Sequence, residues 1–257
     1  MARTVLITGA SSGIGAALAL HYARSGGTLG LLGRNAERLQ NVAAECRRLG
    51  AAATTAVIDS RDRAEMTKWI GAFDRTSPVD LVIANAGTME GRRPDAAIEP
   101  ADQAYALVET NVLGVLNTVQ PLLTPMMARR RGQIAIVSSL AGFVPLPDAP
   151  SYSASKAAVL SYGLSLRALL APNGVGVSVI CPGYVTTPML RRESGPKPFK
   201  MSAEKAAALI GRGLARNKAT IVFPFWFGLV TRIGGMLPDR LRRWSTGPFR
   251  FTVSDPK

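Results

Sequence analysis

Cysteine and histidine are scarce in this chain. Its 257 residues include two cysteines, Cys46 and Cys181, and one histidine, His21. Two cysteines are too few for a disulfide framework, and without a C-x-x-C pair or a histidine-rich neighbour we expect no metal site. A single histidine in the middle of an expected helix makes a Ser-His-Asp hydrolase hard to build, so we interpret His21 as structural. Because no second histidine is available to activate Cys181, we expect it to be inert.

A long apolar run is missing from the N-terminal segment, MARTVLITGASSGIG. The apolar run over residues 5–7 is too short for the core of a signal peptide, and glycines follow it closely. We therefore expect a cytoplasmic protein in a reducing compartment.

Acidic residues are few for the number of basic ones. The chain has 31 Lys and Arg against 17 Asp and Glu, and its formal net charge is +14. Residues 191–257 hold 14 of the basic residues and only 4 of the acidic ones. Such an excess suits an anionic membrane surface, a phosphorylated ligand or a nucleic acid, but it is equally typical of a solvated basic face. Since no aromatic-interleaved basic patch accompanies it, we expect no nucleic-acid partner.

Short apolar runs alternate along the chain with longer helical patterns. The runs are apolar on both faces, which is typical of parallel strands that helices cover on both sides. The alternation predicts a single α/β domain over residues 1–257, a Rossmann-like doubly wound parallel sheet in a three-layer αβα sandwich. The expected strands are Val5–Thr8, Leu29–Leu32, Ala53–Ile58, Leu81–Ala84, Ile134–Ser138 and Val175–Ile180. The expected helices span about 13–25, 35–49, 62–75, 101–120, 152–171 and 203–217.

The stretch 219–257 forms a C-terminal extension that is first apolar and then basic. Its apolar part, ATIVFPFWFGLVTRIGGML, is interrupted by Pro224 and contains Arg232, so it is marginal for a membrane-spanning helix. One interpretation is a last strand over Thr220–Phe223, followed by a helix that closes a pocket or contacts another subunit. The alternative is peripheral membrane contact through residues 219–250, since an apolar segment beside a cationic one can lie in a membrane interface.

A glycine-rich loop, Thr8-Gly-Ala-Ser-Ser-Gly-Ile-Gly15, follows the first expected strand and opens the first expected helix. A dinucleotide site requires this context, because glycines let the backbone turn sharply and approach a pyrophosphate, while the helix N-terminus offers free N–H groups. The alternative is an ordinary tight turn. We expect the cofactor to contact Gly9, Ser11, Ser12, Gly13, Ile14 and Gly15.

The second expected strand ends at Gly33-Arg34. An NAD site usually places a carboxylate here for the ribose hydroxyls, and Gly33 has none. The guanidinium of Arg34 is well shaped to pair with a 2′-phosphate, so we expect NADP(H) to be preferred, with NAD(H) as the alternative. Arg34 would otherwise merely solvate the end of the strand.

Four further motifs occur in order along the chain. They are Asn85-Ala86-Gly87, Asn111-Val112, Ser139 with Tyr152-Ser-Ala-Ser-Lys156, and Pro182-Gly183-Tyr184-Val185-Thr186-Thr187. Together with the G-x-x-x-G-x-G loop, these motifs make the chain resemble the short-chain dehydrogenase/reductases, in their single-domain branch. The resemblance covers residues 1–190 firmly and 191–257 loosely.

Tyr152 and Lys156 are the central pair of the expected chemistry. They are four residues apart, so they share one face of a helix. An ammonium beside a phenol favours the phenolate, so we expect Lys156 to lower the pKa of Tyr152, which is about 10 when unperturbed. Tyr152 can then exchange a proton with a carbonyl or alcohol oxygen. On its own, such a pair is more often just a surface contact.

The resemblance supplies the remaining catalytic roles. It implies that Ser139 binds the substrate oxygen, with Ser138 as the competing candidate, and that the 13-residue interval to Tyr152 favours Ser139. It also implies that Lys156 bonds to the nicotinamide ribose and that Asn111 holds a water linking Lys156 to solvent. The alternative for Asn111 is a buried helical asparagine that satisfies backbone groups.

Further cofactor contacts are also implied by the resemblance. Thr187 and the backbone of Val185 should contact the carboxamide, while Asp59 and Ser60 should flank the adenine. Asn, Asp, Ser and Gly also supply ordinary turns, which is the alternative. The other residues expected to line the cofactor cleft are Asn85, Ala86, Gly87, Tyr152, Lys156, Pro182 and Gly183.

The expected substrate pocket is apolar. Its walls should be Leu140–Pro150, Tyr184 and a substrate-binding loop and helix over residues 188–202, and such walls favour hydrophobic or bulky carbonyl compounds. Basic residues at its mouth would suit an acyl chain with an anionic head. The apolar wall residues are Phe143, Val144, Leu146, Pro147, Met189, Phe199 and Met201. The basic rim residues are Arg191, Arg192, Lys197 and Lys200.

These patterns predict an NADP(H)-dependent oxidoreductase that moves a hydride between nicotinamide and a carbonyl or alcohol carbon. One alternative is an NAD(H)-dependent alcohol dehydrogenase, and another is a membrane-associated scaffold that binds NADP(H) without turnover. By the resemblance we expect a homodimer or homotetramer, with residues 101–120 and 152–171 as the contact helices.

Overall fold

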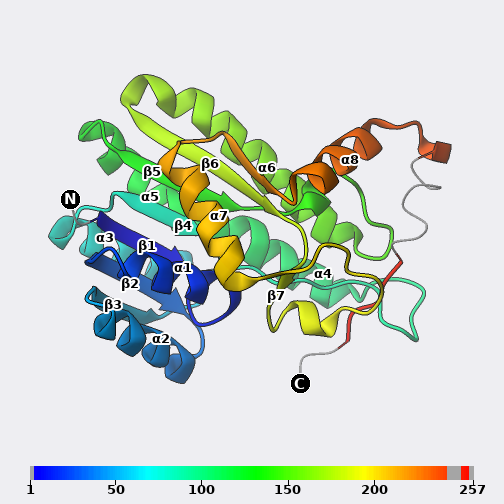
Figure 1. Cartoon of the computed structure of the whole chain (residues 1–257), viewed down its shortest axis with the longest axis horizontal. Coiled ribbons are helices and arrows are strands. Elements are labelled where there is room, and N and C mark those ends of the chain that lie inside the picture. Colours follow the sequence, from blue (N-terminus) through cyan, green and yellow to red (C-terminus); the bar gives the residue numbers. More distant parts are fainter. Residues whose placement is uncertain (1–2, 242–249, 255–257) are drawn as a thin grey trace.

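The computed structural model describes residues 3–241 and 250–254. Within these residues seven parallel strands form one sheet, in the spatial order β3-β2-β1-β4-β5-β6-β9 (Figure 1). A separate two-stranded sheet pairs β7 (Val185–Thr186) with β8 (Met201–Ser202). The strands of the main sheet are β1 (Arg3–Thr8), β2 (Gly27–Gly33), β3 (Ala52–Val57), β4 (Leu81–Ala84), β5 (Gly132–Val137), β6 (Val175–Pro182) and β9 (Thr220–Phe223).

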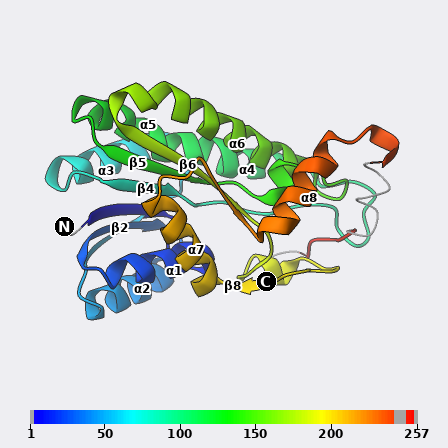
Figure 2. The same ribbon diagram turned by 45° about the horizontal axis from the view of Figure 1, so that its top comes forward.

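Helices cover both faces of the sheet, which confirms the predicted doubly wound α/β fold (Figure 2). One layer consists of α1 (Gly13–Ala23), α2 (Ala36–Arg48) and α7 (Ala203–Ala215). The opposite layer consists of α3 (Arg63–Thr76), α4 (Ala101–Val108), α5 (Gly114–Ala128) and α6 (Pro150–Leu170). The remaining helix, α8 (Phe225–Met236), follows β9.

Alternating side chains of each strand enter different cores. Val5 and Ile7 of β1 pack in the core under α1, α2 and α7, whereas Leu6 packs in the core under α3, α5 and α6. All three are at most 1% exposed. Fully burying such a side chain stabilises a fold by about 1.5–3 kcal/mol, so strands that are apolar on both faces are stable only between two helical layers.

The predicted helix over 101–120 has a different form in the structure. A π-helical turn over Glu109–Leu113 joins α4 to α5, and α5 continues past Pro121 and Pro125 to Ala128. The π turn carries Asn111, one of the expected site residues, and single π turns inside α-helices are often found at functional sites.

The C-terminal region supports the first interpretation of the extension. Thr220–Phe223 is the strand β9, paired with β6, and α8 after it lies at the end of the sheet where the cavity described below opens. Residues 250–254 return to the loop over 188–202, where Val253 forms an antiparallel bridge with Glu193. None of the helices in the described part of the chain has both the length and the apolar composition needed to cross a bilayer. Residues 242–249 and 255–257, which belong to the predicted extension, lie outside the described residues.

Candidate active site

A cavity of about 830 Å³ lies at the carboxyl ends of β1, β4, β5 and β6. The strand order reverses between β1 and β4, and in open α/β sheets ligands bind at this kind of switch point. The cavity runs from the glycine loop after β1, past Tyr152 and Lys156, to α8. Its volume is in the range of ligand sites.

The glycine loop fits a dinucleotide because its backbone must come close to other groups. Gly9 and Gly13 have φ angles of +66° and +57°, which side chains rarely adopt. A Cβ on Gly13 would lie 3.1 Å from Thr187, so a larger residue would crowd the opposite wall of the cleft. Gly15 lies behind the wall, where a Cβ would lie 2.3 Å from the Gly9 carbonyl oxygen and push α1 away from β1. Gly9, Ser11, Ser12, Gly13 and Ile14 line the cavity.

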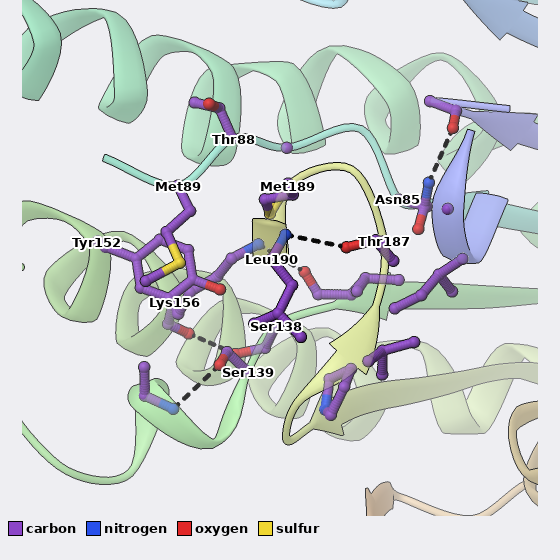
Figure 3. Close-up of a pocket in the computed structure, with 18 of the residues that line it drawn as sticks. Asn85, Thr88, Met89, Ser138, Ser139, Tyr152, Lys156, Thr187, Met189 and Leu190 are labelled. Atoms are coloured by element: carbon purple, nitrogen blue, oxygen red, sulfur yellow. Dashed lines mark hydrogen bonds between the residues drawn. The ribbon is translucent and has the colours of Figure 1, made fainter. Parts of the chain in front are cut away.

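The Asn85-Ala86-Gly87 segment forms the wall facing this loop. The amide of Asn85 donates a hydrogen bond of 2.9 Å to the Thr8 carbonyl, which fastens the end of β4 to the end of β1 (Figure 3). All three residues of the segment line the cavity, as expected.

Two guanidinium groups lie at the end of the cleft beyond Gly33. Arg34 lines the cavity with its side chain 68% exposed, 3.9 Å from Asp59. Arg38, which sequence reasoning missed, lines it as well. The sequence contained a signal for it, because Asn35 is a typical N-cap residue and Arg38 follows three positions later, in the first turn of the helix. In the structure the Asn35 side chain accepts a hydrogen bond of 2.8 Å from the Arg38 amide.

The two residues expected to flank an adenine have different surroundings. Ser60 lines the cavity, whereas Asp59 lies beside its wall and accepts hydrogen bonds of 2.8 and 3.1 Å from the Arg61 guanidinium. These hydrogen bonds from Arg61 lower the pKa of Asp59, so its carboxylate is charged and is paired with the Arg61 guanidinium.

Tyr152 is almost fully enclosed, with 9% of its surface exposed. Burial raises its pKa to about 12, an effect that the Ser139 hydroxyl opposes by hydrogen bonding and that the nearby charge of Glu193 reinforces. The expectation that the pKa of Tyr152 lies below its ordinary value is therefore wrong, because loss of water around the phenol raises it.

Lys156 lies on the same face of α6 as Tyr152, as the spacing predicts. Its ammonium is 5.7 Å from the centroid of the Tyr152 ring, beside which Lys156 lies in Figure 3, and it donates a hydrogen bond of 3.1 Å to the Val137 carbonyl. Burial lowers the pKa of Lys156 to about 8. The ammonium is thus still largely charged at neutral pH.

The two adjacent serines at the end of β5 have separate roles. Ser138 is 3% exposed and donates its hydroxyl to the backbone carbonyl of Lys156 at 2.7 Å. Ser139 accepts a hydrogen bond of 3.1 Å from the Ala141 amide, and its hydroxyl is beside Tyr152. This geometry favours Ser139 over Ser138 as the residue that meets a substrate oxygen.

Asn111 is completely buried behind the cavity wall. Its amide oxygen accepts a hydrogen bond of 2.8 Å from the Thr88 amide, and its nitrogen donates to Thr88 and to Ser155 at 2.9 and 3.1 Å. A Cβ on Gly87 would lie 3.1 Å from the Asn111 oxygen and 3.4 Å from the Lys156 nitrogen, so glycine lets both groups approach. The structure thus brings Asn111 near Lys156, and its role as a water ligand stays a prediction.

The motif after β6 forms the nicotinamide end of the expected site. Pro182, Gly183, Val185 and Thr187 all line the cavity. The Thr187 hydroxyl accepts a hydrogen bond of 3.3 Å from the Leu190 amide, which connects the end of this motif to the substrate loop (Figure 3).

The substrate end of the cavity is apolar, but several expected wall residues are elsewhere. Phe143 faces Arg232, whose guanidinium carbon is 4.5 Å from the ring centroid, and Met201 packs against the core. Pro147 is exposed, and Phe199 is 68% exposed because its loop turns it outward. The apolar residues that do line this end are Met89, Leu140, Val144, Leu146, Met189, Leu190, Phe227, Val230, Ile233 and Leu237.

The expected basic rim is also wrong. The Arg192 guanidinium donates hydrogen bonds of 2.8 and 3.0 Å to the Glu90 carboxylate. The Lys197 ammonium donates one of 2.6 Å to the backbone carbonyl of Glu193. Arg191 and Lys200 are exposed, and none of the four basic residues lines the cavity. The ionisable residue of this loop in the wall is instead Glu193, which sequence reasoning missed although it is the only acidic residue between 188 and 202.

The fold and this arrangement match one family of known proteins. A family model described as short chain dehydrogenase matches residues 3–197. An uncharacterized oxidoreductase of Myxococcus xanthus is 37% identical over 93% of this chain and 94% of its own length. Oxidoreductase UcpA of Escherichia coli strain K12 is 36% identical over 83% of this chain and 82% of its own. A short-chain dehydrogenase of Sphingobium yanoikuyae, solved in complex with NADPH, is 26% identical with a TM-score of 0.76, covering 93% of this chain and 99% of that one.

The chain therefore belongs to the short-chain dehydrogenase family, and it is an oxidoreductase. The family model covers the glycine loop, both guanidinium groups, Ser139 and the Tyr152–Lys156 pair.

Proposed function

We propose that this protein is an NADP(H)-dependent oxidoreductase that interconverts a carbonyl and an alcohol on a hydrophobic substrate. The observation that carries the proposal is the position of Tyr152. Its phenol is buried beside Ser139 and Lys156, between a glycine-rich nucleotide cradle and an apolar compartment of the same cavity. A proton donor, a nucleotide site and an apolar substrate site thus meet at one point.

The residues divide the work of carbonyl reduction among them. The nicotinamide supplies the hydride when it is bound. Ser139 donates a hydrogen bond to the carbonyl oxygen, where negative charge develops. Tyr152 gives its proton to the same oxygen, and its high pKa keeps the phenol protonated at neutral pH, which suits the reductive direction. Lys156 faces the ring and holds a positive charge near the phenolate that remains.

Arg34 and Arg38 support the preference for NADP(H). Both line the cavity where a 2′-phosphate would lie, and the neighbouring Gly33 has no side chain to offer a ribose hydroxyl. A Cβ on Gly33 would lie 3.3 Å from Ser11, so the strand end also has little room for a carboxylate. The Sphingobium relative was solved with NADPH.

The test is loss of absorbance at the reduced nicotinamide band, measured with NADPH and NADH in parallel. The substrates run from small aldehydes to long-chain and cyclic ketones. We expect turnover with NADPH on the bulky apolar ketones and no turnover by Tyr152→Phe, which keeps the packed ring and binds NADPH normally. NADPH binding without turnover across the panel would instead favour a non-catalytic NADP(H)-binding scaffold, and faster turnover with NADH would favour an NAD(H)-dependent alcohol dehydrogenase.

We also infer peripheral membrane contact through α8. Phe225, Trp226 and Met236 on this helix are 66%, 74% and 86% exposed, next to residues that line the cavity. An exposed apolar helix at the mouth of an apolar cavity offers a hydrophobic substrate a path from a bilayer. Flotation with phosphatidylglycerol vesicles should retain the wild type and release Trp226→Glu; equal recovery of both would reject the contact.

We also propose that the protein is a homodimer or homotetramer whose subunits contact one another through α4, α5 and α6. Tyr105 on α4 and Leu169 on α6 are 74% and 67% exposed, so these helices present apolar side chains that a second copy of the chain could cover. Light scattering after size exclusion should give a multiple of the chain mass of 27.2 kDa, which Tyr105→Lys reduces.

A further inference from the structure

We propose that Glu193 is a specificity residue whose carboxylate accepts a hydrogen bond from a hydroxyl or ammonium group of the substrate, away from the reacting carbonyl. The inference rests on the proposed function and deepens it. It names the substrate class as bulky apolar carbonyl compounds that carry a hydrogen-bond donor.

The carboxyl of Glu193 is buried, and within residues 3–241 and 250–254 no group donates a hydrogen bond to it. The residue is 6% exposed and lines the cavity. Its backbone is occupied, since the carbonyl accepts from Lys197 at 2.6 Å and the amide donates to Leu190 at 3.4 Å. Among the described residues, no side chain or backbone group donates a hydrogen bond to its carboxylate oxygens. Burying a carboxylate without hydrogen-bond donors costs free energy. A ligand that supplies a donor recovers part of this free energy when it binds.

Glu193 lies close to the reacting oxygen. Its charge raises the pKa of both Tyr152 and Tyr184, which line the same cavity. Burial raises the pKa of Glu193 itself to about 7, and the ammonium of Lys197 opposes that rise. At neutral pH a donor on the substrate can therefore also shift the carboxyl toward its charged form.

The backbone around Glu193 holds the carboxyl in the cavity wall. Val253 bridges to Glu193 from the C-terminal segment, and the Arg192 guanidinium is fixed to Glu90 and to the Ser254 carbonyl at 2.9 Å. The adjacent Arg192 thus has its ionic partner outside the cavity, while Glu193 is the ionisable residue of the loop in its wall. A polar group held rigidly in an apolar site discriminates well between ligands, because ordering costs little at the moment of binding.

This placement reverses the substrate expected from the basic composition of the loop. An acyl chain with an anionic head would bring a second negative charge to Glu193, in surroundings where burial strengthens the repulsion. A hydroxyl or amine on an apolar skeleton satisfies the carboxylate, and the apolar walls bury the rest of the molecule.

The experiment compares matched ligands in matched variants. The ligands are 2-decalone, a set of hydroxy-2-decalones that differ in the position of the hydroxyl, and the corresponding amino-2-decalones. Binding to the NADP⁺-loaded protein is measured by calorimetry, and kcat/KM is measured with NADPH. The variants are Glu193→Gln and Glu193→Leu, with Glu204→Gln as control because Glu204 is exposed at the start of α7, outside the cavity.

We expect the wild type to prefer at least one hydroxy-2-decalone over 2-decalone by about 10-fold or more, as a hydrogen bond to a charged group provides. Glu193→Leu should lose this preference, and Glu193→Gln should keep part of it for hydroxyl but lose it for ammonium. Glu204→Gln should behave as the wild type. Removing an unpaired buried carboxyl relieves a cost, so Glu193→Leu is expected to fold.

Equal discrimination by the wild type and Glu193→Leu would overturn the inference. Calorimetric preference for a hydroxy-2-decalone that disappears in Glu193→Leu, without turnover of any ketone, would support the inference and reject the proposed reaction. Turnover of 2-decalone with no preference in any variant would support the reaction and reject the inference.

Discussion

The Ser138 hydroxyl donates a hydrogen bond of 2.7 Å to the backbone carbonyl of Lys156. This contact joins the end of β5 to the helix that carries Tyr152, and it uses the Ser138 side chain for structure. Ser139, one residue later, is therefore the serine free to meet a substrate, and the adjacent pair provides a matched comparison.

Ser139→Ala should lower kcat by about 10²–10³-fold, the usual effect of removing one donor to a developing oxyanion. Ser138→Ala should keep kcat within a few-fold but lower the free energy of unfolding by about 1 kcal/mol, because one buried hydrogen bond is lost. Steady-state kinetics of both variants measures kcat, and urea unfolding measures the free energy of unfolding. The assignment of roles is wrong if Ser138→Ala proves the more damaging to kcat at unchanged stability.

Arg34→Ala and Arg38→Ala should each raise KM for NADPH by about 10- to 100-fold, since each removes a charge-assisted contact to a phosphate. KM for NADH should change little, so the ratio of the two kcat/KM values is the quantity to measure. Arg48→Ala is the control, because Arg48 is on the same helix and pairs with Glu45 away from the cavity. A uniform loss with both cofactors would point to damage to α2 rather than to phosphate recognition.

Asp148 predicts how the fold responds to acid. This carboxylate is 1% exposed and accepts hydrogen bonds from Arg250 at 2.7 Å, from Arg92 at 3.0 Å and from the Phe251 amide at 3.1 Å. Burial alone would raise its pKa, but these hydrogen bonds outweigh burial and lower it. The stabilisation is therefore complete above the unfolded pKa of about 3.9 and is lost as pH falls through the lower folded value.

Asp148→Asn should reduce the free energy of unfolding at pH 7 by about 2–4 kcal/mol, less than for a fully shielded pair because Arg250 is partly exposed. The difference from the wild type should shrink as pH approaches 3, which urea unfolding at pH 7, 5 and 3 would measure. Asp95→Asn, at an exposed position in the same loop as Arg92, should have no such effect. A difference that stays constant with pH would contradict the role of the charge.

Lys156 predicts a second pH dependence of stability, at the alkaline end. Its folded pKa of about 8 lies below the unfolded value of about 10.4, so burying the ammonium costs stability at pH 7 and that cost is recovered between pH 8 and 10.4. Lys156→Met should be inactive yet more stable than the wild type at pH 7, by at most on the order of 3 kcal/mol. The gain should vanish near pH 10.4 in urea unfolding. A variant that is less stable at pH 7 would show that the hydrogen bond to Val137 matters more than the buried charge.

The sheet could be predicted almost completely from the sequence, since both faces of its central strands are buried. Such strands are short apolar runs with clear ends, and β4 was predicted at its observed bounds, Leu81–Ala84. The glycine loop could be predicted equally well, because its conformation depends on residues that are neighbours in the sequence. The π turn around Asn111 was not predicted, as it leaves no distinct pattern in side-chain spacing.

The substrate end could not be predicted in detail because its geometry depends on contacts between distant segments. The composition of residues 188–202 indicated an apolar wall with a basic rim, but composition does not determine which way each side chain points. Phe199 is exposed and Glu193 lines the cavity, and the loop that carries both is joined at Glu193 to Val253, 60 positions further along the chain. The pKa of Tyr152 was misjudged for the same reason, since burial depends on the whole fold.

The C-terminal segment over residues 250–254 and the cavity are thermodynamically linked. Phe251 and Val253 pack in the same apolar cluster as Tyr152, and Val253 also pairs with Glu193. A molecule that holds Tyr152 and Glu193 in place therefore also favours the docked position of this segment, and a docked segment reduces the conformational entropy lost when the molecule binds. Affinity for the cavity and protection of residues 250–254 from hydrogen exchange should consequently rise and fall together.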